Sequence, residues 1–308
     1  MNPSHRTAAA MAAACGAGFL WGTGALVVNL LIAQFGLAPE RVSFWRFVVG
    51  AAVLLAVFGR SLWRGPWRAQ GWLLLGAGSC MALYVLCWFL GIERIGAAVP
   101  TLIALCLPPV LVTLLAVLRG RERLDPALVA TLAAALGGTA LVVMRHESAT
   151  GAASAATLWA GVGFSVASAL LYAGFTLVSG RLSTTLGAGP ATTGLTLVAA
   201  VVMALAAVYT PMGWPTDLPP EAWLLYLGLV TAALALLAFT WGAARLSPTA
   251  LTVATLVEPL TAVLLAAWLL GQDLAPPQWL GALLMVAAIA ALGRRDARRA
   301  AGLADAPR

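Results

Sequence analysis

Glu258 is the residue of this 308-residue chain whose position carries most chemical meaning. It lies about ten residues into an apolar run from Pro248 to Leu270, so at about 1.5 Å per residue it would sit about 15 Å deep in a bilayer. An ionised carboxylate is costly there, and intramembrane acids mark ion or substrate pathways. Two interpretations stay open. Glu258 either exchanges a proton or holds a cationic group, or it is a protonated or hydrogen-bonded acid that stabilises a broken helix.

Two prolines occupy matching positions within apolar runs, and each interrupts helical hydrogen bonding. Pro108 and Pro259 lack the amide proton that would bond the carbonyls of Ala104 and Thr255. Such carbonyls persist at membrane depth only where protein or water satisfies them. We therefore expect both helices to line a central cavity at these points, with a simple packing kink as the alternative.

Other side chains of the apolar runs could contribute to the same site. Arg46 could hold an anionic group or close an outer gate, or it could extend toward the lipid headgroups. Tyr84 and Trp88 share one helix face, and aromatic walls bind apolar or cationic groups, although packing against lipid is the commoner role of such residues. The further candidates are Trp21, Asn29, Tyr172 and Trp241.

The chain lacks most of the residue combinations that enzyme mechanisms within a membrane require. A serine mechanism would need a histidine within the apolar runs, whereas His5 and His146 lie outside them. An aspartyl mechanism would need two membrane carboxylates, and no glycine-rich loop with a lysine is present to hold ATP. The four cysteines lack metal-ligand spacing. We expect no enzyme, metal or cofactor; a receptor or structural role, an intramembrane enzyme and a channel are the alternatives.

The composition indicates an all-α integral membrane protein. Apolar residues make up 62% and charged residues 9% of the chain, against about 45 to 50% and 25% in soluble domains. Its net charge of +7 comes from arginines between apolar runs, which does not fit a nucleic-acid-binding surface. The ten predicted spans are Met11 to Ala33, Val42 to Gly59, Trp72 to Ile92, Ala97 to Leu118, Pro126 to Met144, Leu158 to Val178, Ala191 to Tyr209, Trp223 to Ala244, Pro248 to Leu270 and Pro276 to Leu292.

The arginines predict the orientation of these spans, because cytoplasmic loops collect positive side chains. With the N-terminus inside, 14 of the 18 arginines fall on the inner side and only Arg41, Arg94 and Arg145 on the outer side. We therefore expect a multi-pass protein of a bacterial-type cytoplasmic (inner) membrane with both termini cytoplasmic. The arginine-rich tail after Gly293 is expected to be a solvated cytoplasmic end.

The chain repeats itself at an offset of 151 residues. Between Gly91 and Leu141 this register gives 14 identities in 51 positions without a gap, where roughly five are expected by chance. The offset predicts a first five-helix repeat at 1–154 and a second at 155–308. Five is an odd number, so the second repeat must enter the membrane upside down. Inverted repeats predict alternating access to a central site.

These residues resemble the EamA-type permeases of the drug/metabolite transporter superfamily over nearly the whole chain. The resemblance rests on Trp21 and Gly22, on Arg46, on Pro108 followed by Arg121, Glu122, Arg123 and Leu124, and on Glu258 and Pro259 followed by Gln272, Asp273 and Leu274. It implies a secondary transporter that exports amino acids, other metabolites or toxic compounds. Asp273 replaces the usual glutamate, and the first span lacks the acid of the small multidrug relatives, so proton-for-drug exchange by that route is not implied.

From the resemblance and the residues together we expect three partners: the lipid bilayer, a small-molecule substrate and a proton gradient as the candidate energy source. The single acid and few buried arginines favour neutral or zwitterionic amphiphiles over phosphorylated compounds. The protein is expected to be a monomer or a weak homodimer.

Overall fold

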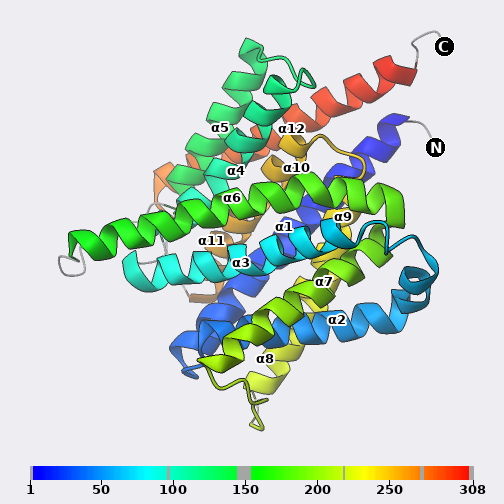
Figure 1. Cartoon of the computed structure of the whole chain (residues 1–308). Helices are drawn as coiled ribbons and strands as arrows, with labels where there is room; N and C mark the ends of the chain where they lie inside the picture. The colour runs from blue at the N-terminus through cyan, green and yellow to red at the C-terminus, as the bar shows by residue number, and fades with distance from the viewer. Residues whose placement is uncertain (1–2, 96–97, 144–153, 218, 271–273, 305–308) are drawn as a thin grey trace.

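The computed structural model describes residues 3–95, 98–143, 154–217, 219–270 and 274–304, and every regular element within them is helical (Figure 1). Gln272 and Asp273, on which the family resemblance partly rests, lie outside the described residues. The elements are α1 (Pro3–Ala33), α2 (Pro39–Arg64), α3 (Gly71–Ile95), α4 (Ala98–Leu118), α5 (Pro126–Val143), α6 (Ala155–Leu186), α7 (Ala188–Ala204), η1 (Leu205–Val208), α8 (Pro220–Tyr226), η2 (Leu227–Leu234), α9 (Ala235–Ala243), α10 (Pro248–Ala254), α11 (Val257–Leu270) and α12 (Pro276–Ala304).

These elements form ten rods that match the ten predicted spans. Among the described residues, nine helical stretches are long and apolar enough to cross a membrane, and α7 is a shorter apolar helix that continues into the 3₁₀ turn η1. Elements α8, η2 and α9 make one rod, and α10 and α11 make another. Several rods extend beyond the predicted ends because helical hydrogen bonding continues past the hydrocarbon layer, as in α6.

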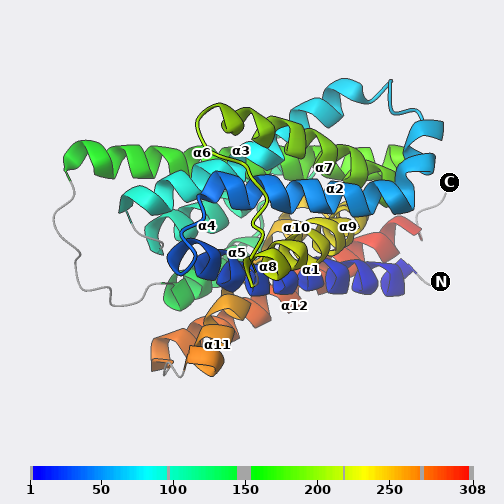
Figure 2. The same cartoon turned by 90° about the horizontal axis from the view of Figure 1, so that it is seen from below.

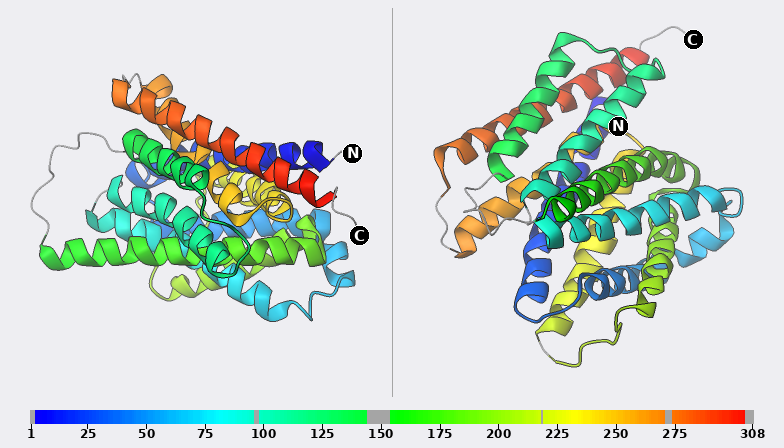
Figure 3. Two further views of the ribbon diagram at one scale, coloured as in Figure 1. Left: turned by 90° about the horizontal axis from the view of Figure 1, so that it is seen from above. Right: turned by 60° about the vertical axis from the view of Figure 1, so that its left-hand side comes forward.

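The helix contacts come in equivalent pairs that are related by exchanging the two repeats, as the offset of 151 residues predicts. Helix α3 lies along α6 in Figure 1, and its repeat counterpart α9 packs on α1, the counterpart of α6. Likewise α4 packs on α6, and α11 packs on α1. Two further cross-repeat contacts join a helix to its own counterpart: α2 packs on α7, and α5 packs on α12. Helices α5 and α12 lie side by side in both views of Figure 3.

Both chain ends lie at the same end of the molecule. Figure 2 shows the start of α1 and the end of α12 together at the right, as an even number of crossings requires. An odd number of rods in each half gives the two halves opposite directions. The all-helical fold of two inverted five-helix repeats is therefore confirmed.

Small residues allow the closest helix contacts. A Cβ atom at Gly91 of α3 would lie 2.9 Å from the Ser165 hydroxyl of α6. The counterpart glycine, Gly242 of α9, faces Ala10 and Ala14 of α1 in the same way. Because lipid tails are as apolar as the side chains, close backbone approach is a main source of attraction between membrane helices.

Backbone irregularities occur only in the second repeat among the described residues. The rod that begins at Pro248 breaks at Thr255 and Leu256, whereas α4 continues through Pro108 and Pro109. Element η2 is a π-helix, a wide helical turn that is frequent at functional sites. The two repeats therefore share one arrangement of helices, but the second differs in backbone geometry at the Thr255–Leu256 break and at η2.

Charged side chains tie the repeats together at the arginine-rich end. Glu122, in the loop between α4 and α5, is 6% exposed and accepts hydrogen bonds from Arg299 of α12 at 2.7 Å and from Thr249 of α10 at 3.0 Å. Arg295 pairs with Asp125 at 2.6 Å. We call these four residues, Glu122, Asp125, Arg295 and Arg299, the inner latch, after the side of the membrane that the arginine distribution predicts for them.

The expectation of a solvated tail is wrong for Asp296, which is buried, whereas Arg294 and Arg298 are exposed as expected. Helix α12 continues to Ala304, and Asp296 within it is 8% exposed. Its carboxylate accepts hydrogen bonds from the Ser247 amide at 2.8 Å and from the Ser247 hydroxyl at 3.1 Å. Residues 295–299 of the tail pack against the rest of the molecule, because Arg295, Asp296 and Arg299 bond to loops that are distant in sequence.

Candidate functional site

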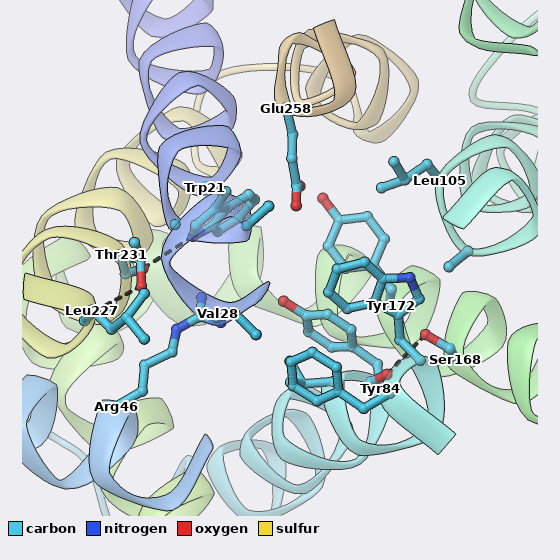
Figure 4. Close-up of a pocket in the computed structure, with 16 residues that line it drawn as sticks. Trp21, Val28, Arg46, Tyr84, Leu105, Ser168, Tyr172, Leu227, Thr231 and Glu258 are labelled. Atoms are coloured by element: carbon cyan, nitrogen blue, oxygen red, sulfur yellow. Dashed lines mark hydrogen bonds between the residues drawn. The ribbon is translucent and has the colours of Figure 1, made fainter. Parts of the chain in front are cut away.

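A central cavity lies between the repeats, in the position that the offset predicts for a binding site. Its walls come from α1, α2, α3, α4, α6, η2 and α11, so both halves contribute (Figure 4). The lining residues are Trp21, Gly24, Ala25, Val28, Arg46, Tyr84, Val85, Trp88, Phe89, Ala104, Leu105, Ser168, Tyr172, Leu227, Thr231 and Glu258. The wall is mainly apolar, with one carboxylate and one guanidinium group.

Glu258 enters the cavity from the start of α11, directly after the helix break. Its amide donates to the Thr255 carbonyl at 2.9 Å, which gives that carbonyl the partner that Pro259 cannot supply. The side chain points into the cavity in Figure 4. A carboxylate in the first turn of a helix also lies at the positive end of the helix dipole. The break thus positions the acid while leaving its oxygens directed at the open space.

Helix α1 holds this break in place through close contact. A Cβ atom at Gly22 would lie 2.6 Å from the Glu258 carbonyl oxygen, and one at Gly18 would lie 2.8 Å from the Thr255 carbonyl oxygen. Neither position has room for a side chain. The backbone of α1 therefore fixes where the carboxylate enters the cavity.

Arg46 reaches the cavity from α2, on another side from Glu258 (Figure 4). Its Nε is buried without a hydrogen-bond partner among the described residues. Within the described part of the chain the guanidinium group has no carboxylate within 4.0 Å, and its recorded ring contact is with Phe47, 5.7 Å from the ring centre. The two opposite charges therefore face one space without forming a direct ion pair.

Aromatic rings form a continuous wall beside these charges. Tyr84 and Tyr172 meet edge to face with ring centres 5.1 Å apart. Tyr172 also contacts Phe239 at 6.3 Å, and Phe239 contacts Trp21 at 5.5 Å. The Tyr172 hydroxyl shares a hydrogen bond of 3.1 Å with Thr255 next to the break. This packing fixes the rings as a rigid surface that suits an apolar or cationic ligand group.

The π-helix η2 gives Trp21 a polar partner. The indole nitrogen of Trp21 donates to the Thr231 carbonyl at 3.0 Å, while the Thr231 hydroxyl donates to the Leu227 carbonyl at 2.6 Å. A buried indole N–H needs such an acceptor. The wide turn thus places a carbonyl where the first span of the other repeat can reach it.

The structure brings six of the predicted site residues together around the cavity. They are Trp21, Arg46, Tyr84, Trp88, Tyr172 and Glu258. Their role in binding or coupling stays a prediction, because no ligand is present.

The other predicted site residues lie outside the cavity lining. Pro108 and Pro259 are buried but do not line the cavity. Their helices line it through Ala104 and Glu258 instead. A helical side chain covers the turn that precedes its own Cα, so a residue at the predicted depth need not be the one that faces the cavity. Thr255 does not line the cavity, but its hydroxyl shares a hydrogen bond with the hydroxyl of Tyr172, which does. The Trp241 ring packs under the Arg245 guanidinium, 4.0 Å from the ring centre. Asn29 is exposed.

Sequence reasoning missed Ser168 and Thr231. Ser168 donates to the Tyr84 carbonyl at 2.8 Å and so joins α6 to α3 beside the cavity. A lone Ser or Thr in an apolar span carries little signal, because most bond a carbonyl of their own helix, as Ser165 and Thr176 do. The offset of 151 residues could identify site residues only at Trp21 and Tyr172, where both copies are aromatic.

A family model matches this architecture twice along the chain. The model of the EamA-like transporter family matches residues 8–144 and 159–294, which together span most of the protein. The chain belongs to the EamA-like transporter family. It is accordingly a multi-pass membrane transporter of the drug/metabolite transporter superfamily, and the family points to transport rather than catalysis.

Two known proteins are similar to this EamA-like chain. The "Uncharacterized transporter YwfM" of Bacillus subtilis (strain 168) is 31% identical over 283 residues, which cover 88% of each protein. A solved structure described only as "Crystal structure of protein" matches with a TM-score of 0.75 and 23% identity, over 92% of this chain and 96% of the other. At that identity the structural match supports the fold alone.

Proposed function

We propose that this protein is a secondary transporter that exports amino acids, other small metabolites or drug-like compounds by alternating access. The observation that carries the proposal is the central cavity, which lies where the two inverted repeats meet and takes its walls from both. Two similar halves can exchange their conformations, and the exchange opens a shared site to each side in turn. The repeats 1–154 and 155–308 are the units that would exchange.

The inner latch supports this proposal because it connects the repeats at one end. Glu122 belongs to the first repeat, whereas Arg299 and Thr249 belong to the second. Thr113 of α4 shares a further hydrogen bond of 2.9 Å with Thr249. Opening the cavity toward this end requires these contacts to break. We infer that the arginine-rich end faces the cytoplasm, as the arginine distribution predicts.

Counterflow in proteoliposomes tests the transport activity. Vesicles containing the purified protein are loaded with one unlabelled compound and placed in its labelled form, using in turn amino acids, nucleosides and lipophilic cations. A carrier gives transient, saturable accumulation of at least one compound above protein-free vesicles. A receptor, a structural protein or an intramembrane enzyme moves none, and exchange of no compound in the panel contradicts the proposal.

Glu258→Gln tests the coupling role. If Glu258 exchanges a proton, the variant loses transport driven by an imposed pH gradient by at least tenfold while still supporting counterflow at saturating substrate, because an amide cannot take up and release the proton. Glu93→Gln, at the exposed end of α3, is the matched control and keeps both activities. Undiminished gradient-driven transport in Glu258→Gln rejects proton coupling through this residue.

A further inference from the structure

The cavity contains one basic and one acidic side chain, one from each repeat, and neither forms an ion pair with a described neighbour. Arg46 lies in the first repeat, and its guanidinium group makes no hydrogen bond or ion pair among the described residues. Glu258 lies in the second repeat, and within the described part of the chain only its backbone makes a hydrogen bond. Both side chains enter the same space in Figure 4. Both groups thus have free hydrogen-bonding capacity directed into the cavity.

These charges are not a product of the internal duplication. At the offset of 151 residues Arg46 corresponds to Leu197 and Glu258 corresponds to Leu107. The aromatic wall, by contrast, is repeated, since Trp21 corresponds to Tyr172. A structural requirement of the repeat would call for charge in both copies. The two charges are instead single additions, one per half, that meet only in the folded protein.

Leaving both groups unpaired in a mainly apolar cavity is unfavourable. Buried charges need partners, and removal of one member of a buried pair leaves a costly charge behind. The separation of more than 4.0 Å between Arg46 and any described carboxylate leaves room for a group between the two. A ligand that carries both signs of charge would satisfy both at once.

We propose that the ligand of this cavity is a small zwitterion with an apolar body, bound through its anionic group by Arg46 and through its cationic group by Glu258. This inference rests on the proposed function. Arg46 suits a carboxylate, because its planar guanidinium group can donate two parallel hydrogen bonds. The apolar body packs against Val28, Leu105 and Leu227 and against the aromatic wall. A phosphorylated ligand fits less well, because an ionised Glu258 would repel its second negative charge.

The test uses one apolar scaffold in several charge states. Leucine is the zwitterion, leucinamide the cation and N-acetylleucine the anion, and 6-aminohexanoate is a zwitterion with more widely separated charges. Binding to the purified full-length protein is measured as ligand-dependent thermal stabilisation, and exchange is measured by counterflow. We expect at least one zwitterion to bind at least tenfold more tightly than leucinamide and N-acetylleucine.

Two variants assign each charge to its partner. Arg46→Gln is expected to remove the preference for the zwitterion over the cation, while discrimination against the anion remains. Glu258→Gln is expected to remove the preference over the anion, while discrimination against the cation remains. Arg94→Gln and Glu93→Gln, both outside the cavity lining, are the matched controls and keep the wild-type order of affinities. A merely structural role would weaken all ligands alike and would not give this crossed pattern.

Three results would overturn the inference. One is equal or tighter binding of leucinamide or N-acetylleucine by the wild-type protein. Another is an equal loss of all ligands in both variants, and the third is no binding of any compound in this set. The proposed function fails separately, only when no compound of the broader counterflow panel is exchanged.

Discussion

At the scale of single residues, the cavity depends on glycines of α1 as well as on the side chains that line it. Gly18 and Gly22 let α1 approach the helix break so closely that backbone atoms of Thr255 and Glu258 occupy the space of a Cβ atom. Glycine lowers helix stability by about 1 kcal/mol relative to alanine, so both positions carry a local cost. That cost is offset by a contact that fixes where the carboxylate of Glu258 enters the cavity.

Gly22→Ala is therefore expected to destabilise the protein. The new methyl group would lie 2.6 Å from the Glu258 carbonyl oxygen and from the Thr261 Cβ, so α1 or α11 must shift. Overpacking of this kind costs about 1 to 3 kcal/mol. Thermal unfolding of the purified protein in detergent measures the effect. Gly16→Ala on the same helix is the control: no atom lies within 4 Å of its Cβ position, so stability should stay the same or rise. Equal melting temperatures for Gly22→Ala and Gly16→Ala would show that the close contact has no energetic weight.

At the scale of elements, the inner latch joins a loop of one repeat to the last helix of the other. Asp125 caps α5 by accepting a hydrogen bond of 2.8 Å from the Leu128 amide, and it pairs with Arg295 of α12. These bonds, first of all the one from Arg295, lower the pKa of Asp125 to about 2. The folded protein therefore favours the carboxylate form more strongly than the unfolded chain does.

The depressed pKa predicts a pH dependence for the latch. A carboxyl group whose folded-state pKa is below its unfolded value stabilises the fold above the unfolded value, and this stabilisation is lost as the pH falls through the folded pKa. The contribution of Asp125 should be full near pH 7 and decline as the pH falls from about 4 to about 2. The melting temperature of Asp125→Asn should thus lie below that of the wild type at neutral pH, with the gap closing in acid. Asp217→Asn, in an exposed loop, is the control. A gap that stays constant from pH 7 to pH 3 would refute the assignment.

At the scale of the whole molecule, the duplication decides the topology. An even number of rods brings the start of α1 and the end of α12 to one end of the molecule (Figure 2). The inner latch involves Arg295 and Arg299, near the end of α12. Most arginines of the chain fall on this side of the predicted spans. The positive-inside rule therefore predicts that this end faces the cytoplasm.

Fusions test this orientation directly. A green fluorescent protein joined after Arg308 should fluoresce, and an alkaline phosphatase at the same point should be inactive, because both would be cytoplasmic. A short tag inserted at Gly36, between α1 and α2, should be accessible from outside the cell. Active phosphatase at the C-terminus, or termini on opposite sides, would contradict both the orientation and the inverted arrangement.

The sequence by itself determined the helices, their number and their duplication. Hydrophobicity is a local property that adds up along a span, so 20 or so apolar residues identify a crossing without knowledge of its neighbours. The repeat is visible at a fixed offset for the same reason, since residues such as Pro108 and Pro259 keep their register. Glu258 could be selected because a carboxylate is rare at that depth.

The tertiary structure alone decided which side chains meet. A span that is apolar on all sides does not reveal which face turns inward, so Trp241, Asn29 and the two prolines could not be separated from the residues that line the cavity. Arg46 and Glu258 lie more than 200 residues apart in the chain, and only the packing of α2 and α11 around one space brings them together. The partners of Arg295, Asp296 and Arg299 likewise depend on how α12 crosses loops of distant sequence, because hydrogen bonds and ion pairs form between neighbours in space.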